Sequence, residues 1–215
     1  MLREIEGPAG RLEALLDEPS TGSNGVRAAV VFGHPHPQYG GTMHNKVVYQ
    51  SAKAFARIGC AILRFNFRGV GASAGSFDEG VGESDDFRAA LDFMHARHPT
   101  ARLWAGGFSF GAWIALTVGA ADARVSTLVG VAPPVAGHDF RAVLQSSKPK
   151  FFIQGERDEI CPLKSMQEFY AHCEEPKELV VIDAADHLFD GHTTEVGEAL
   201  EDLLGDFGER TSDHG

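Results

Sequence analysis

The sequence is poor in cysteine, with three in 215 residues. Cys60, Cys161 and Cys173 lie far apart, and no Cys-x-x-Cys pair occurs among them. An odd number of isolated cysteines argues against a disulfide framework and against a thiolate zinc site. We therefore expect three reduced thiols and no structural metal.

Basic residues are also scarce, since 19 Lys and Arg stand against 30 Asp and Glu, a formal net charge of −11. Nucleic acid binding draws most of its affinity from clustered Lys and Arg, so this balance argues against a nucleic acid partner. The acidic residues are spread along the chain, apart from a mildly acidic end at residues 201–215. That end favours solubility rather than a particular partner.

Long apolar runs are missing too. Although 43% of the residues are hydrophobic, no stretch of about 20 apolar residues could span a bilayer. The first residues, Met-Leu-Arg-Glu-Ile-Glu, lack the apolar core of a secretory signal. We expect a cytoplasmic protein with no membrane partner.

What the chain does contain is a regular alternation of short apolar runs and segments with helical spacing. This order predicts an α/β fold, a mainly parallel, doubly wound sheet with helices on both faces. We expect one domain over residues 1–215, with N-terminal strands within residues 1–25 and a disordered tail at 208–215. The predicted strands are 26–32, 60–67, the run from Arg102 to the next turn, 125–131, 150–154 and 178–182, and the predicted helices are 45–58, 81–98, 163–173 and 194–207.

That turn is Gly107-Phe108-Ser109-Phe110-Gly111, between an apolar run and an alanine-rich segment with helical spacing. A Gly-x-Ser-x-Gly between strand and helix is typical of a nucleophile elbow. The serine takes strained backbone angles there, and the two glycines let strand and helix pass closely.

A base and an acid follow at suitable places. In an open parallel sheet, the loops after the strands share one edge and supply the active site. Asp158 and His187 lie on such loops, 49 residues after Ser109 and 29 residues further on. An imidazole can take the serine proton, and a carboxylate can orient the imidazole. We therefore predict a triad of Ser109, Asp158 and His187.

Competing residues exist for both partners. His192 follows His187 by five positions, and we prefer His187 because it is the first histidine after the final strand. Asp158 is preferred among the acids because it has a loop of its own, while the alternatives lie next to His187 or follow a different strand. These alternatives are Asp139, Asp183 and Asp186.

The oxyanion hole needs two backbone N–H groups, one from the residue after the nucleophile and one from an early loop. The first is Phe110. In the loop at 33–41 the prolines at 35 and 37 cannot donate, which leaves His36 ahead of Gln38 and Tyr39.

Two other interpretations of these loops are weaker. His34, His36 and His44 could suggest a metal, but the loop has no thiolate or carboxylate at ligand spacing. The glycines at 69–75 resemble a phosphate-binding fingerprint, yet no helix begins on them. We expect no metal, no dinucleotide and no other cofactor.

With these motifs in place, the chain resembles an α/β-hydrolase from about residue 12 to residue 207. The His-Pro-His-Pro-x-Tyr-Gly-Gly-Thr-Met loop at 34–43, the Gly-x-x-Asp at 155–158 and the Asp-His pair at 186–187 resemble those of small, lidless bacterial members, similar to dienelactone hydrolases. His34-Pro35 stands where the wider family commonly has His-Gly. The resemblance implies a serine triad on Ser109, Asp158 and His187.

The predicted function is hydrolysis of a small carboxylic ester or thioester through an acyl-enzyme, as in carboxylesterases. The alternatives are acyl transfer by the same triad and a non-catalytic binding module that keeps the fold. Residues 132–147, between two strands, are too few for a cap domain. We therefore expect a shallow cleft built from segments 34–41, 69–77 and 133–140, and a preference for short acyl chains.

Overall fold

The computed structural model describes residues 3–19 and 25–207. Part of the predicted N-terminal segment, residues 1–2 and 20–24, and the whole of the predicted tail at 208–215 lie outside the described residues.

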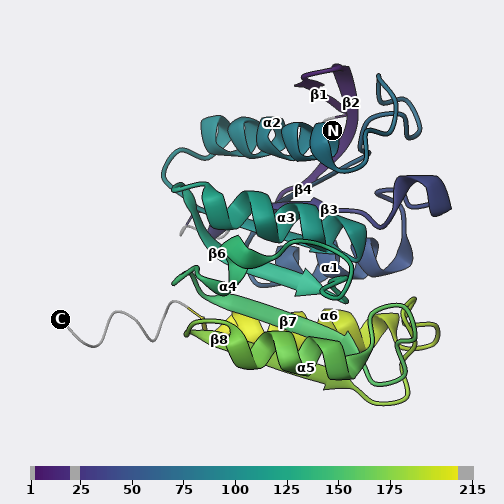
Figure 1. Ribbon diagram of the computed structural model, residues 1–215. Helices are drawn as coiled ribbons and strands as arrows, with labels where there is room; N and C mark the ends of the chain where they lie inside the picture. Colours follow the sequence, from purple (N-terminus) through teal and green to yellow (C-terminus); the bar gives the residue numbers. More distant parts are fainter. Residues whose placement is uncertain (1–2, 20–24, 208–215) are drawn as a thin grey trace.

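A sheet of eight strands runs through the molecule in the order β1-β2-β4-β3-β5-β6-β7-β8 (Figure 1). The strands from β3 to β8 pair in parallel, and β1 and β2 join the β4 side as antiparallel strands. The mainly parallel sheet is as predicted. The strands are β1 Glu4–Gly7, β2 Gly10–Asp17, β3 Ala28–Gly33, β4 Ala61–Phe65, β5 Arg102–Phe108, β6 Val125–Val131, β7 Lys150–Gly155 and β8 Lys177–Ile182.

Helices cover both faces of the sheet (Figure 1). Two apolar cores result, one on each face. On one face α1 and α6 pack over Phe32, Trp104 and Phe108. On the other, α2, α3 and α5 cover Phe65 and Phe152. Every residue of β3, β4 and β7 is buried, as strands between two helical layers should be, and this includes the polar residues Arg64, Lys150 and Gln154. The helices are α1 Lys46–Arg57, α2 Val81–Arg97, α3 Phe110–Ala121, α5 Leu163–His172 and α6 Thr193–Gly205.

The connections after β3 and β6 depart from the predicted pattern. A 3₁₀ turn, η1, covers Pro37–Tyr39, where the sequence suggested only a shaped loop. The crossover from β6 to β7 holds a single helical turn, α4 Arg141–Leu144, where no helix was among the predicted elements. Because this crossover is so short, nothing in it forms a lid. In the described ranges, no helix is long and apolar enough to cross a bilayer.

Candidate active site

Ser109 occupies the sharp turn between β5 and α3. Its backbone has φ 54° and ψ −120°, a strained conformation for a residue with a side chain. The turn is held because the Ser109 N–H donates to the Val131 carbonyl at 2.9 Å, at the end of the neighbouring strand. A Cβ on Gly107 would collide with the Gly111 backbone, and one on Gly111 with Gly33. The two glycines therefore allow β3, β5 and α3 to meet behind the serine.

The structure brings the three predicted residues together at the carboxyl edge of the sheet. His187 Nε2 lies 2.9 Å from Ser109 Oγ, and His187 Nδ1 lies 2.8 Å from Asp158 Oδ2. All three side chains are buried, with the serine and the histidine slightly open to solvent. The arrangement fits a neutral imidazole that donates from Nδ1 to the carboxylate and accepts at Nε2 from the serine hydroxyl.

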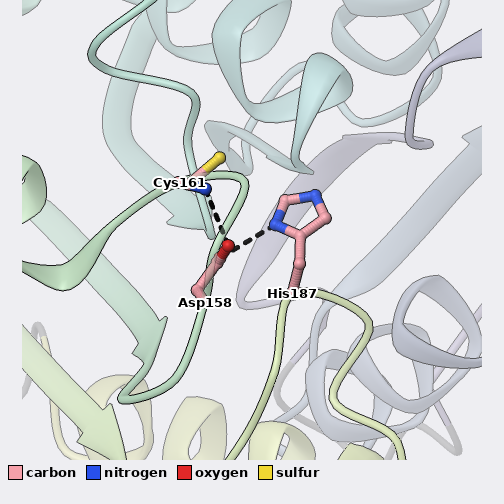
Figure 2. A group of neighbouring side chains, drawn as sticks. All are labelled: Asp158, Cys161 and His187. Atoms are coloured by element: carbon pink, nitrogen blue, oxygen red, sulfur yellow. Dashed lines mark hydrogen bonds and ion pairs between the residues drawn. The ribbon is translucent and has the colours of Figure 1, made fainter.

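Asp158 is fixed by four hydrogen-bond donors. Oδ1 accepts from the backbone N–H groups of Ile160 at 2.9 Å and Cys161 at 2.7 Å. Oδ2 accepts from the Gln154 amide at 2.9 Å as well as from His187. Figure 2 shows the Cys161 amide and the His187 ring approaching the carboxylate from different sides. The acid is therefore held rigidly against the imidazole. Sequence analysis overlooked Gln154, whose only signal is a polar side chain at the end of an apolar strand.

The loops after β7 and β8, which carry Asp158 and His187, are joined to each other. The Glu156 carboxylate accepts from the Ala184 N–H at 2.8 Å, and the Arg157 N–H donates to the Ala185 carbonyl at 2.9 Å. A Cβ on Gly155 would lie 2.6 Å from the Ala185 oxygen, so only glycine allows this approach. The acid and the base thus share one framework.

Donor atoms of Asp158, Cys161 and His187 lie within 4.8 Å of one another, the one such group of three found in the described residues. Their chemistry does not suit a metal ion. Asp158 and His187 already bond each other, and burial raises the pKa of the Cys161 thiol to about 12, which keeps the sulfur protonated. The group is better explained by the hydrogen bond between the Asp158 carboxylate and the His187 ring, with a buried thiol beside it.

The competing residues make other contacts. His192 Nδ1 pairs with Glu195 at 2.8 Å in the first turn of α6. Asp139 forms an exposed ion pair with Arg141, and Asp186 accepts the Asp190 N–H. Within the described residues, the His187 ring forms no hydrogen bond with Asp139, Asp183 or Asp186.

Of the His36, Gln38 and Tyr39 N–H groups in the loop after β3, two already have acceptors within the loop. The Gln38 N–H donates to His36 Nδ1 at 3.2 Å, and the Tyr39 N–H donates to the His36 carbonyl at 3.1 Å. No partner in the described part of the chain engages the His36 N–H or the Phe110 N–H. These two amides remain available to an oxygen in the cleft.

His34 anchors this loop from inside the protein, a role that sequence analysis missed. Its ring is fully buried; Nδ1 lies 2.6 Å from the Pro35 carbonyl, and Nε2 accepts the Phe67 N–H at 3.0 Å. Burial lowers the pKa of His34 to about 4, so the ring is neutral near pH 7. It therefore couples the loop after β3 to the loop after β4.

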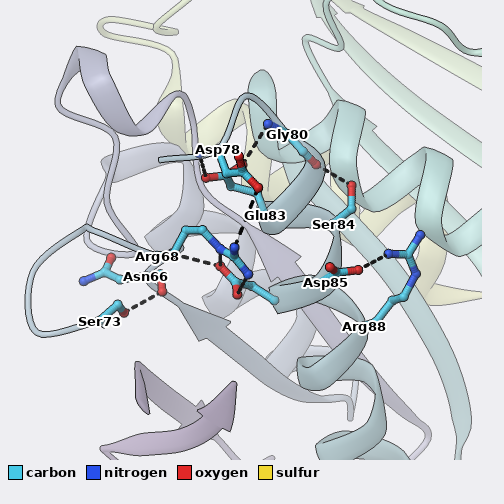
Figure 3. A network of polar contacts seen from close by, with 10 residues as sticks. Asn66, Arg68, Ser73, Asp78, Gly80, Glu83, Ser84, Asp85 and Arg88 are labelled. Atoms are coloured by element: carbon cyan, nitrogen blue, oxygen red, sulfur yellow. Dashed lines mark hydrogen bonds and ion pairs between the residues drawn. The ribbon is translucent and has the colours of Figure 1, made fainter. Parts of the chain in front are cut away.

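A buried ionic network holds the loop after β4. Arg68 pairs with both oxygens of Asp86, at 3.0 and 2.7 Å, and Asp86 is fully buried on α2. The buried Glu83 accepts the N–H groups of Asp78 and Gly80 at the start of that helix (Figure 3). The network fixes the segment at 66–80, which lies beside the cleft.

The cleft at Ser109 has a cavity volume of about 440 Å³. Segments 34–41 and 133–140 contribute to its wall, as predicted, but segment 69–77 does not line it. The Phe77 ring instead packs behind His36, with ring centroids 5.1 Å apart, and the wall is completed by side chains from the Asp158 and His187 loops. The lining residues are Pro35, His36, Tyr39, Gly40, Gly41, Asn45, Ser109, Phe110, Pro134, His138, Ile160, His187 and Leu188.

Comparison with known proteins finds a matching family model and several similar proteins, two of them solved α/β serine hydrolases. Residues 25–148 match the family model described as serine aminopeptidase, S33. An uncharacterized protein of Rickettsia prowazekii, RP471, is 37% identical over 93% of this chain and 87% of its own length. An α/β serine hydrolase homologue from Coxiella burnetii has a TM-score of 0.88 and 39% identity, covering 94% of this chain and 95% of that one. XC6422 from Xanthomonas campestris, an α/β serine hydrolase without a lid, has a TM-score of 0.86 and 36% identity over 94% and 91%.

Proposed function

This chain belongs to the α/β serine hydrolase family described as serine aminopeptidase, S33, and from that premise we propose that it hydrolyses small carboxylic esters or thioesters. The observation that carries the proposal is the hydrogen-bonded chain from Ser109 Oγ through His187 to Asp158, at 2.9 and 2.8 Å. These distances suit proton transfer from the serine without rearrangement.

In the proposed mechanism Ser109 Oγ attacks the acyl carbon while its proton passes to His187 Nε2. Asp158 orients the ring and stabilises the imidazolium that forms. The Phe110 and His36 N–H groups would receive the oxyanion. The imidazolium then protonates the leaving alcohol or thiol, and a water activated by His187 releases the acid and restores the serine.

The lining of the cleft favours an ester over the terminal residue of a peptide. An aminopeptidase must bind a substrate α-ammonium, for which a carboxylate is the ordinary partner. No Asp or Glu stands among the described residues that line the cavity. The lining is instead mostly apolar, which suits an uncharged acyl group.

Hydrolysis is favoured over acyl transfer because the cleft is open to water. Tyr39, Ile160 and Leu188 line it, and all three are exposed. An acyltransferase must keep water from the acyl-enzyme, and in the described chain no segment covers this cleft. Product analysis with added methanol separates the two, since an acyltransferase would form methyl ester in large excess over the acid.

The direct test is labelling with a fluorophosphonate probe, followed by peptide mass mapping. We expect the adduct on Ser109, no labelling of Ser109→Ala, and a loss of p-nitrophenyl acetate hydrolysis of several orders of magnitude in that variant. Asp158→Asn should fold and lose about 10⁴ in kcat, whereas Asp139→Asn should retain activity. An unlabelled wild-type protein would favour a non-catalytic binding module, and a larger loss in the Asp139 variant would assign the acid elsewhere.

A further inference from the structure

Several aromatic and imidazole rings line the cleft and contact one another. His36, Tyr39, Phe110 and His138 all line the cavity. The centroid of His36 lies 4.7 Å from that of Tyr39 and 5.0 Å from that of Phe110. Centroid distances of this size are those at which aromatic rings attract one another. These rings therefore form a wall that starts in the loop after β3 and continues onto the first residue of α3.

Trp113, one turn further along α3, does not line the cavity itself, but its ring joins the lining rings to the opposite loop. Its ring stacks on His138 with centroids 3.9 Å apart and planes within 19°, and it meets Phe110 edge-on at 5.6 Å. His138 belongs to the connection after β6, which is far from His36 in the chain. The rings thus form a continuous surface, which we call the aromatic wall and define as His36, Tyr39, Phe110, Trp113 and His138.

Part of this wall is left uncovered. Tyr39 is 86% exposed although it lines the cavity. On the side of the acid and base loops, Ile160 and Leu188 are 69% and 53% exposed. Large apolar side chains gathered around a cavity mark a surface that a ligand covers. A substrate group lying in the cleft would contact Tyr39 on one side and Ile160 and Leu188 on the other.

The wall carries little charge. Burial lowers the pKa of both His36 and His138, so neither ring is expected to be cationic near neutral pH. Among the described lining residues there is no Lys, Arg, Asp or Glu. The wall therefore suits a neutral planar group better than an anion or an ammonium ion.

The chemistry decides which half of the substrate faces the rings. The leaving oxygen must reach His187 to take its proton, so the alcohol departs on the side of His187 and Leu188. The carbonyl oxygen points to the backbone N–H groups of Phe110 and His36, so the acyl group takes the remaining direction, away from His187 and past those amides. There it can lie against the side-chain rings that line the cavity, Tyr39 and His138 among them.

We propose that the preferred substrates are esters whose acyl group carries an aromatic ring close to the carbonyl, of the arylacetyl type, and that this ring lies against the aromatic wall. The proposal rests on the esterase function proposed above. An aromatic contact adds to simple burial, so an aromatic acyl group should be favoured about twofold to tenfold over its saturated analogue.

The test compares p-nitrophenyl phenylacetate with p-nitrophenyl cyclohexylacetate, two acyl groups of the same reach. Each kcat/KM is divided by the rate constant for hydroxide hydrolysis of the same ester, which removes the difference in intrinsic reactivity. We expect a ratio above two in the wild type. Tyr39→Leu and His138→Leu should bring it towards one. Tyr49→Leu is the matched control, because Tyr49 is an exposed tyrosine outside the cavity and its loss should leave the ratio unchanged.

A wild-type ratio below two overturns the proposal, as does a ratio that survives both wall variants. A preference found only between benzyl acetate and cyclohexylmethyl acetate would move the ring to the alcohol side and overturn the acyl assignment. Failure of the esterase function is distinguished by p-nitrophenyl acetate, which would then not be hydrolysed in a Ser109-dependent way. In that case calorimetry with phenylacetate and cyclohexylacetate still tests the wall, since equal affinities would refute it.

Discussion

Acid should destabilise this protein through His34, the histidine that anchors the loop after β3. The neutral ring accepts the Phe67 N–H at Nε2, so a proton there would remove a hydrogen bond and place a charge in a fully buried site. Burial lowers the pKa of His34 from 6.5 to about 4 in the folded state. The unfolded chain therefore binds this proton more readily, and the free energy of unfolding falls as the pH drops from about 6.5 towards 4.

The size of the effect follows from that difference in pKa. A pKa lowered from 6.5 to about 4 corresponds to about 3 kcal/mol of unfolding free energy, which is fully lost once the pH falls below the folded-state pKa. About 2 kcal/mol of it is lost between pH 7 and pH 5. The His34 contribution is fully present above the unfolded pKa. Above pH 7 this residue should cause almost no pH dependence.

The measurement is urea unfolding of wild type and His34→Gln at pH 7 and at pH 5. Glutamine keeps an acceptor for Phe67 and a donor for Pro35 but cannot titrate. We expect the wild type to lose about 2 kcal/mol more than the variant over this interval. His95→Gln, which removes an exposed histidine, should behave like the wild type.

If wild type and His34→Gln lose the same free energy of unfolding between pH 7 and pH 5, the role of His34 is refuted. If the variant does not fold, the same question is answered in the wild type by an NMR titration of labelled histidine. A His34 ring that gains its proton near pH 6.5 in the folded protein would contradict the buried, neutral state.

Three further predictions concern activity and stability. In the wild type, kcat/KM for p-nitrophenyl acetate should rise with pH through one ionisation and then level off, because a neutral imidazole is required as base; a metal chelator should have no effect, and inhibition by it would point to other chemistry. Asp86→Ala should cost about 1.5 to 3 kcal/mol in urea unfolding because it removes the fully buried acceptor of both the Arg68 N–H and the Arg68 guanidinium; the exposed pair of Asp139 and Arg141 gives the control, and Asp139→Ala should change little. Among straight-chain p-nitrophenyl esters, kcat/KM should peak at about two to six acyl carbons, since each buried methylene gains about 0.8 kcal/mol only where apolar wall covers it; an optimum at twelve carbons or more would contradict the open cleft.

The regular elements were predictable because burial on both faces of a parallel sheet leaves a strong signal. The strand at 125–131 has the predicted bounds, and α1 and α2 begin and end within one residue of the prediction. The η1 turn and the single turn of α4 were not predictable in the same way. Such short pieces bury few side chains, so no apolar periodicity marks them.

In the candidate site too, residues marked by local sequence were predictable and residues placed by distant contacts were not. Ser109 could be placed from local sequence because its elbow depends on neighbours two positions away. Choosing His187 over His192 depended on position relative to a strand, and the physical reason lies elsewhere, since His192 has its own partner in Glu195. The roles of Gln154 and His34 are set by contacts between loops that are distant in sequence. No spacing rule could have identified them.

The side chains behind the site show how its two halves are held. On one side His34 ties the loop of the candidate oxyanion donor to Phe67, next to the Arg68–Asp86 pair on the same segment. On the other, Gln154 and the amides of the loop after β7 hold Asp158. The two supports lie on opposite sides of β5 in the sheet, and Ser109 at the end of β5 stands between them. A disturbance of the first support should therefore weaken stabilisation of the oxyanion and leave the His187–Asp158 contact intact, whereas a disturbance of the second should impair the base and leave the donor loop in place.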